Sequence, residues 1–280
     1  ENGEVYSFGR NNFGQLGIGY PESTNFIEKL SFKLGRENTF HLHYRFPQKI
    51  ELIQDTVDFV SCGHSYVICK TNNAEIYVWG SNSFGQLGIS SKKPIFEPKK
   101  CLNIPSDIVD IKCGNNHTLV LTVNQDVYSC GDFHYGKLGT DTPHNYLSLE
   151  KIEVSKITRI ECGSNHSMCI DENHDLYIFG ENEFGQLGEK DIPYKLIKKH
   201  SSLSRVMDIS SRGNHTFVKT MQDKVYSFGR NYYSQIGADT GNFIQAHTCQ
   251  FLPIQVLNEE EYIWNSYTTG NKSKAKSARF

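Results

Sequence analysis

The sequence predicts an all-β fold, a β-propeller built of four-stranded blades, because two strand-pair motifs alternate along the chain. One motif is a strand-like segment with a tyrosine that runs into a glycine-rich turn. It occurs five times: VYSFGRNNFGQLG from Val5, IYVWGSNSFGQLG from Ile76, VYSCGDFHYGKLG from Val127, LYIFGENEFGQLG from Leu176 and VYSFGRNYYSQIG from Val225. The other motif lies between these copies: VDFVSCGHSYVICKT from Val57, IVDIKCGNNHTLVLT from Ile108, ITRIECGSNHSMCID from Ile157 and VMDISSRGNHTFVKT from Val206. Two strand pairs per repeat match the size of a propeller blade.

The spacing of the glycine that ends each tyrosine segment sets the number of units. Gly9, Gly80, Gly131, Gly180 and Gly229 lie 71, 51, 49 and 49 residues apart. The first interval is longer because of residues 20–56, which are rich in aromatic and basic side chains and which we expect to form an insertion loop. Long loops on a regular scaffold often carry function. The chain is therefore predicted to be one domain, residues 1–280, with an insertion at about 20–56.

The two ends of the chain hold complementary halves of a unit. Residues 262–277 match the first half of the repeat through Gly270 and Asn271, whereas residues 1–19 hold only the second half. Pairing the two halves gives five blades by repeat count and removes the free sheet edges. We therefore predict a ring closed by the N- and C-terminal half-repeats. Because the chain starts at Glu1, inside a repeat, the sequence is compatible with two alternatives: a complete ring of five blades, or part of a longer protein.

Composition and charge narrow the classes of partner. The 280 residues are 38% hydrophobic and 21% charged, with a formal net charge of −2, so no global positive field attracts nucleic acid or an anionic membrane. No run approaches the roughly 20 apolar residues of a membrane span. Eight cysteines are present without a CxxC pair, and three recur at one repeat position, so we expect small buried residues. The protein is expected to be soluble and nuclear or cytoplasmic, without a membrane partner.

Two patterns could indicate bound ligands, and both have a structural explanation. Residues 131–137 fit GxxxxGK, but Leu138 replaces the Ser or Thr that would hold Mg²⁺, and the sister copies carry glutamine where Lys137 stands. His117, His166 and His215 recur on neighbouring sheets, which are about 10 Å apart, far beyond a metal bond of about 2 Å. We therefore expect glycine turns and hydrogen-bonded histidines, with no cofactor, no metal and no bond-making catalytic site.

The combination of CG-x-x-H-T with VYSFG-x-N-x-x-GQLG closely resembles the regulator of chromosome condensation repeat, and the likeness covers almost the whole chain outside the insertion. Members of that family are propellers, usually of seven blades. They include a nuclear guanine-nucleotide exchange factor for the GTPase Ran, parts of large ubiquitin ligases, a ciliary scaffold and a plant ultraviolet-B photoreceptor. The photoreceptor function requires clustered tryptophans, whereas this chain has only Trp79 and Trp264.

The resemblance also implies candidate partner-binding residues. In the member that acts on Ran, residues that contact the GTPase, some of them acidic, lie in the turn between CG and H-T. The matching positions here are His64, Ser65, Asn115, Asn116, Ser164, Asn165, Gly213 and Asn214, and none is acidic. The insertion adds Phe40, Tyr44 and Arg45, which are residue types that dominate interface energetics.

Three hypotheses on function follow. The first is a protein-binding propeller without bond chemistry, and the alternative is an exchange factor for a Ran-like small GTPase. The loss of acidic residues weakens the alternative, because charge complementarity guides such encounters. The third is weak chromatin contact through the basic C-terminal tail, which contains Lys272, Lys274, Lys276 and Arg279.

Overall fold

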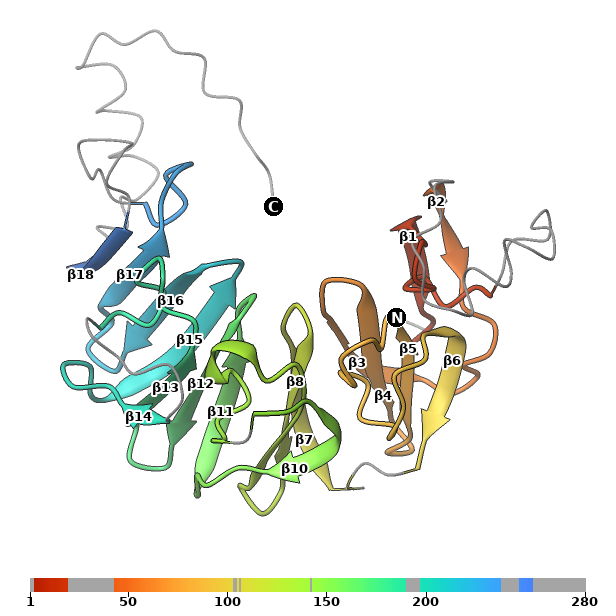
Figure 1. The fold of residues 1–280 in the computed structure, drawn as a ribbon, viewed down its shortest axis with the longest axis horizontal. Coiled ribbons are helices and arrows are strands. Elements are labelled where there is room, and N and C mark those ends of the chain that lie inside the picture. The colour runs from red at the N-terminus through yellow and green to blue at the C-terminus, as the bar shows by residue number, and fades with distance from the viewer. Residues whose placement is uncertain are drawn as a thin grey trace, which may run out of the picture.

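The computed structural model describes residues 3–19, 43–102, 105, 107–141, 143–189, 197–237 and 247–253. Five antiparallel sheets follow one another along an arc (Figure 1). The strands are β1 Tyr6–Arg10, β2 His43–Lys49, β3 Val57–Cys62, β4 Tyr66–Thr71, β5 Ile76–Gly80, β6 Ile95–Cys101, β7 Ile108–Cys113, β8 His117–Thr122, β9 Val127–Gly131, β10 Tyr146–Lys151, β11 Ile157–Cys162, β12 His166–Asp171, β13 Leu176–Gly180, β14 Lys198–Lys199, β15 Val206–Arg212, β16 His215–Thr220, β17 Val225–Arg230 and β18 His247–Pro253. One short 3₁₀ turn, His134–Gly136, interrupts this pattern.

Four of the sheets are complete blades of four strands in chain order: β3–β6, β7–β10, β11–β14 and β15–β18. The first strand of each blade lies on the inner side of the arc, where β11 contacts both β7 and β15. The predicted tyrosine segment is the third strand of every complete blade, and β1 is its copy in the first sheet. The predicted propeller blades are therefore confirmed.

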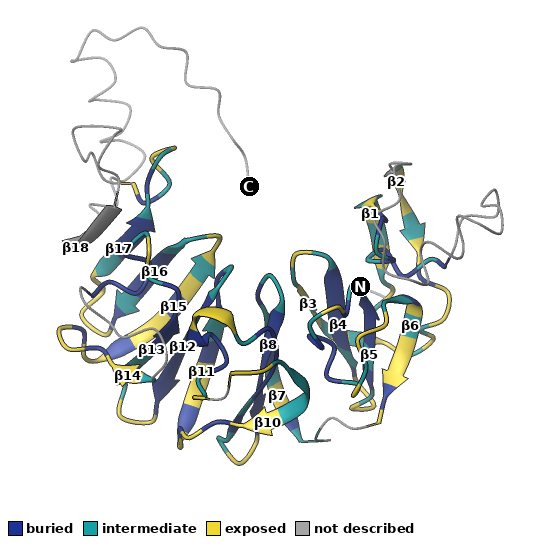
Figure 2. Cartoon of the chain, in the orientation of Figure 1, coloured by how far each residue is buried: buried dark blue, intermediate teal, exposed yellow. Residues whose placement is uncertain are grey.

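The hydrophobic core lies between neighbouring sheets. Strands β8 and β12 are buried along their whole length because a blade packs on each side, and Figure 2 shows them in dark blue. One cluster joins Met168 and Ile178 of one blade to Phe228 of the next. This double burial explains why apolar residues occupy both faces of these strands instead of alternating with polar ones.

The glycine that ends each third strand is required by close backbone approach. Gly131 has φ +110°, and a Cβ there would lie 2.3 Å from the carbonyl oxygen of Asn116. That carbonyl accepts a hydrogen bond from the backbone N–H of Asp132, at 2.8 Å. A side chain at Gly131 would therefore both strain the backbone and displace this hydrogen bond.

The first sheet differs from the other four. Among the described residues it contains only β1 and β2, and β2 lies within the predicted insertion, so residues 43–49 are a regular outer strand. Residues 20–42 of the insertion lie outside the described residues. Phe8 is 66% exposed, whereas its copies Phe179 and Phe228 are fully buried against the preceding blade.

Ring closure remains a prediction, because residues 262–277 lie outside the described residues. No described helix is long and apolar enough to cross a membrane.

Candidate functional site: a cavity in the turn face

Two kinds of turn meet at one end of the sheets. Gly131 pairs with His117 and Gly180 pairs with His166, so the end of each third strand lies beside the start of the second strand. The CG-to-His turns and the glycine-rich turns after the third strands therefore lie at the same end of each blade. We call this end the turn face.

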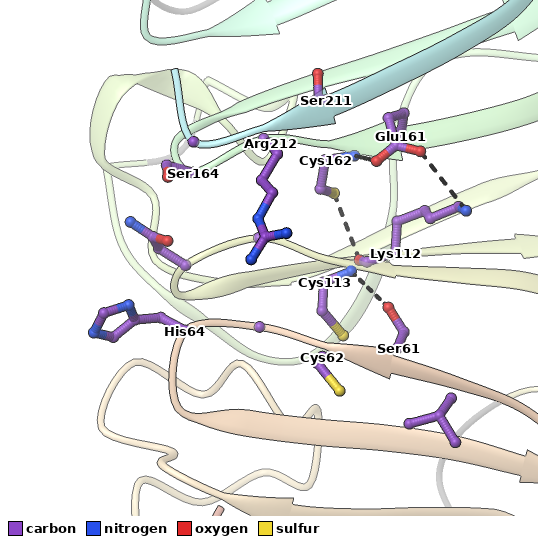
Figure 3. A pocket seen from close by; sticks show the side chains of 16 residues that line it. Ser61, Cys62, His64, Lys112, Cys113, Glu161, Cys162, Ser164, Ser211 and Arg212 are labelled. Carbon is purple, nitrogen blue, oxygen red and sulfur yellow. Dashed lines mark hydrogen bonds and ion pairs between the residues drawn. The ribbon is translucent and has the colours of Figure 1, made fainter. Parts of the chain in front are cut away.

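A cavity of about 700 Å³ opens at the inner edge of the turn face. Four blades contribute to it through the last residues of their inner strands and the turns that follow, at positions 60–64, 112–115, 161–164 and 211–213. Figure 3 shows these side chains around the cavity. The cavity is therefore built from the one turn that each complete blade repeats.

Backbone hydrogen bonds connect the turns from one blade to the next. The N–H of Asn115 donates to the carbonyl of Ser164, at 3.0 Å, and the N–H of Ser164 donates to the carbonyl of Gly213, at 2.8 Å. These bonds fix the second, third and fourth turns relative to one another. The cavity rim is consequently a linked collar rather than a set of independent loops.

The structure separates the predicted turn residues into two groups. The first residue of each turn, His64, Asn115 or Ser164, lines the cavity. The second residue uses its carbonyl oxygen to accept a hydrogen bond from the residue after the third-strand glycine. These bonds join Ser65 to Ser81, Asn116 to Asp132, Asn165 to Glu181 and Asn214 to Arg230, at 2.8–2.9 Å. The second residue of each turn thus supports the blade.

The described insertion residues do not line the cavity. Tyr44 is half-buried and Arg45 is exposed, both on β2, and Phe40 lies outside the described residues. The N–H of Gly19 donates to the carbonyl of Phe96, which follows Ile95 at the turn-face end of β6. The first residue of β2, His43, pairs with Arg10, the last residue of β1, which follows the strand-end Gly9. The described residues that flank 20–42 are therefore at the turn face, the same end as the cavity.

Two of the three repeated histidines, His117 and His166, connect one blade to the next by hydrogen bonds. His166 Nε2 lies 3.0 Å from the Thr216 hydroxyl of the next blade, and that hydroxyl donates to the carbonyl of Gln186, at 2.9 Å. The hydroxyl must therefore accept from His166 Nε2–H. Burial lowers the pKa of His166 to about 3, so the ring stays neutral. Gly163 makes room for this ring, since a Cβ there would lie 2.0 Å from it.

Tyr66 and His117 repeat this role in the preceding blades. The Tyr66 hydroxyl donates to the backbone carbonyl of His117, and His117 Nε2 lies 3.0 Å from the Ser167 hydroxyl. Burial holds the pKa of His117 well below its usual value. We find no group of three or more metal-ligating side chains among the described residues.

Lys137 has a structural environment instead of a phosphate-binding one. It is 1% exposed, and its ammonium donates to Asp132, at 2.6 Å, and to the side chain of Asn165, at 2.8 Å. In a sister turn, Gln186 Oε1 accepts the N–H of Phe184, at 2.8 Å, as expected for a turn glutamine. The Lys137 amine is therefore already paired and shielded from solvent.

The charged side chains of the cavity are Lys112, Glu161 and Arg212. Lys112 Nζ lies 3.7 Å from Glu161 and 3.6 Å from Asp110. Burial raises the pKa of Glu161 to about 7, although the attraction of Lys112 opposes the change. The side chain of Arg212, by contrast, has no ion pair or hydrogen bond with any residue in the described part of the chain.

Arg212 was missed by the sequence analysis. The fourth CG-to-His turn reads SRGN, so Arg212 stands where the other turns carry Gly63, Gly114 and Gly163. The shifted glycine was the available signal. A second correction concerns the repeated cysteines: Cys162 is buried against the preceding blade, but Cys62 is exposed. The inner strand that would cover Cys62 belongs to the first sheet, where no such strand is described.

A chain of repeated four-stranded blades that pack on one another belongs to the class of repeat proteins with a propeller fold. The family model of the RCC1-like domain matches residues 1–274, so the chain belongs to the RCC1-like domain family. Human WBSCR16 has a similar structure, with a TM-score of 0.72 and 18% identity over 90% of this chain and 68% of that one. Prp20p from Saccharomyces cerevisiae gives a TM-score of 0.67 and 17% identity over 92% of this chain and 60% of that one.

Curated relatives are similar over part of the chain. The serine/threonine-protein kinase Nek9 of Mus musculus is 35% identical over 118 residues, which is 40% of this chain. The human X-linked retinitis pigmentosa GTPase regulator is 39% identical over 95 residues, or 33% of this chain. The matched region spans 12% of the kinase and 9% of the regulator.

Proposed function

We propose that this protein is an interaction propeller that holds a protein partner on its turn face without bond chemistry. The observation that carries the proposal is the cavity of about 700 Å³, to which four blades contribute the same turn. Binding sites are concave and present a few polar groups from a preformed scaffold. A linked collar of turns meets that requirement.

The side chains of the collar are available to a partner. Those of His64, Asn115 and Ser164 make no hydrogen bond within the described part of the chain, whereas the backbone N–H groups of Asn115 and Ser164 are already used. A partner that binds here meets donors and acceptors whose positions are fixed in advance. Preorganisation of this kind lowers the entropic cost of association.

Exchange activity toward a Ran-like small GTPase is the second candidate function. It is supported by the likeness to Prp20p, which binds Gsp1p and histones. An exchange factor works by binding the nucleotide-free GTPase more tightly than the loaded form. The turns of this chain offer no carboxylate for such a partner, and the one carboxylate in the cavity lining, Glu161, faces Lys112. The general interaction function is therefore favoured.

Partner capture from nuclear and cytosolic extracts tests both candidates. We expect the wild-type chain to retain a specific protein, and a variant with His64→Ala, Asn115→Ala and Ser164→Ala to lose it. Asp223→Ala is the matched control, because Asp223 is 84% exposed at the opposite end of the sheets. Equal capture by all three proteins contradicts the proposal.

Nucleotide-free and GTP-loaded Ran, added separately, distinguish the two functions. An exchange factor retains the nucleotide-free form preferentially, whereas an interaction propeller shows no such preference.

We also propose a nuclear or cytoplasmic location, as expected for such a module. Chromatin contact through the basic tail concerns residues 272–279, which lie outside the described residues. Binding to reconstituted nucleosomes, with and without these residues, tests it.

A further inference from the structure

We propose that the cavity binds a carboxylate of an acidic partner segment, with Arg212 as the anchoring residue. This inference rests on the proposed function and names the chemistry of the partner. It starts from a departure from the repeat that adds a charge to the cavity lining, the replacement of a turn glycine by arginine.

Arg212 is placed to receive a ligand. It is the last residue of β15, and Figure 3 shows its side chain extending into the cavity between the turns of neighbouring blades. The backbone next to Arg212 is hydrogen-bonded to the neighbouring blade, because the carbonyl of Gly213 accepts the N–H of Ser164. The backbone that carries the guanidinium is therefore anchored, while the guanidinium itself is unpaired among the described residues.

The other charges of the cavity leave Arg212 uncompensated. Lys112 lies within 3.7 Å of Glu161 and 3.6 Å of Asp110, so its charge is already balanced locally. The net effect is one available cation that carries a planar fork of donors, the geometry that pairs with a carboxylate through two hydrogen bonds. The Ser164 hydroxyl and the Asn115 amide, on adjacent turns of the same lining, are additional donors.

The same charges argue against a polyanion. Nucleic acid gains affinity by placing several phosphates against several cations. Here one carboxylate, Glu161, lies in the same cavity, and the whole chain has a net charge of −2. A peptide segment with one or two Asp or Glu side chains suits a single unpaired arginine.

Selection from a random dodecapeptide phage library tests the inference. On the wild-type chain we expect enrichment of Asp and Glu, and on Arg212→Gln we expect that enrichment to disappear. A synthetic peptide of the most enriched sequence should bind at least 10-fold more weakly to Arg212→Gln, and also when its acidic residues become Asn or Gln. Its affinity for the wild type should decrease with added salt.

Two further variants separate a binding defect from a folding defect. Arg212→Gly restores the residue of the sister turns and should melt close to the wild type yet lose the peptide, and Arg212→Lys should keep part of the affinity. Arg159→Gln is the control, since Arg159 is exposed, as Arg212 is, but pairs with Asp208 on the inner strands away from the cavity.

Three results overturn the inference: peptides selected without acidic enrichment, unchanged affinity in Arg212→Gln, or stronger binding of a 20-base-pair duplex than of the acidic peptide. Failure of this inference alone is recognisable, because Arg212→Gln then retains the extract partner that the triple variant loses. If the wild type captures no partner, the proposed function itself fails.

Discussion

Replacing Gly131 by alanine tests the structural role of the turn face quantitatively. Gly131 has φ +110°, and an added Cβ would lie 2.3 Å from the Asn116 carbonyl oxygen and 2.8 Å from the His117 Cα. Both contacts are backbone atoms, so a flexible side chain cannot relieve them. Backbone strain costs about 1–3 kcal/mol, and loss of the Asp132 N–H to Asn116 bond adds about 1 kcal/mol. We expect Gly131→Ala to lower the free energy of unfolding by about 2–4 kcal/mol.

Gly9→Ala is the matched comparison. Gly9 has the same φ of +110°, but no described residue lies within 4 Å of its Cβ position. Only the strain of about 1–3 kcal/mol should apply there. Urea unfolding followed by tryptophan fluorescence measures both variants, since Trp79 is buried between the first two sheets. Unchanged stability in Gly131→Ala refutes the explanation of the turn. A loss in Gly9→Ala as large as in Gly131→Ala supports the predicted closing strand beside β1.

Four other substitutions give three further tests. His166→Tyr places at position 166 the residue that stands at position 66. The pKa of His166 is about 3 in the folded protein and 6.5 in the unfolded chain, so the stability of the wild type falls as the pH drops from 6.5 toward 3, by about 1.4 kcal/mol per pH unit for one proton. Urea titrations across this pH range should show that the variant lacks this component. Glu161→Gln has the opposite pH dependence. Folding raises the pKa of Glu161 from 4.5 to about 7, so the stability of the wild type falls as the pH increases from 4.5 to 7. The variant should therefore be about 1–3 kcal/mol more stable than the wild type at pH 8, and the absence of this gain would contradict the raised pKa. Phe179→Ala should lower the free energy of unfolding by about 3–5 kcal/mol, because Phe179 is buried. Phe8→Ala should lower it by less than about 1 kcal/mol, because Phe8 is 66% exposed. Equal losses in the two variants would mean that Phe8 is covered.

The fold was predictable because its signals are local and repeated. The tyrosine strands, their terminal glycines and the turn glutamines each satisfy a requirement within a single blade, so every copy gives the same information. The structural role of the histidines followed from the distance between neighbouring sheets. The outer strand β2 was missed because its sequence, HYRFPQK, contains a proline and lies in the stretch that breaks the sequence repeat.

The candidate site was only partly predictable, for geometric reasons. Asn115 and Asn116 are adjacent and identical in chemistry, yet the first lines the cavity and the second supports Asp132 through its carbonyl. The sequence alone does not show which of these two asparagines hydrogen-bonds through its backbone carbonyl to the next turn. The exposure of Cys62 depends on the position of its blade in the arc, which the repeat does not indicate. Arg212 becomes a candidate binding residue only because the fold brings four turns together around one cavity.

Site-specific photo-crosslinking tests the central claim, that the turn face binds the partner, most directly. A benzoylphenylalanine at position 115 lies in the cavity lining, and one at position 223 lies in the β16–β17 hairpin at the opposite end of the sheets. After irradiation in nuclear or cytosolic extract, we predict a discrete crosslinked protein from position 115 that is absent from position 223. A crosslink of equal strength at both positions, or only at position 223, would contradict the account.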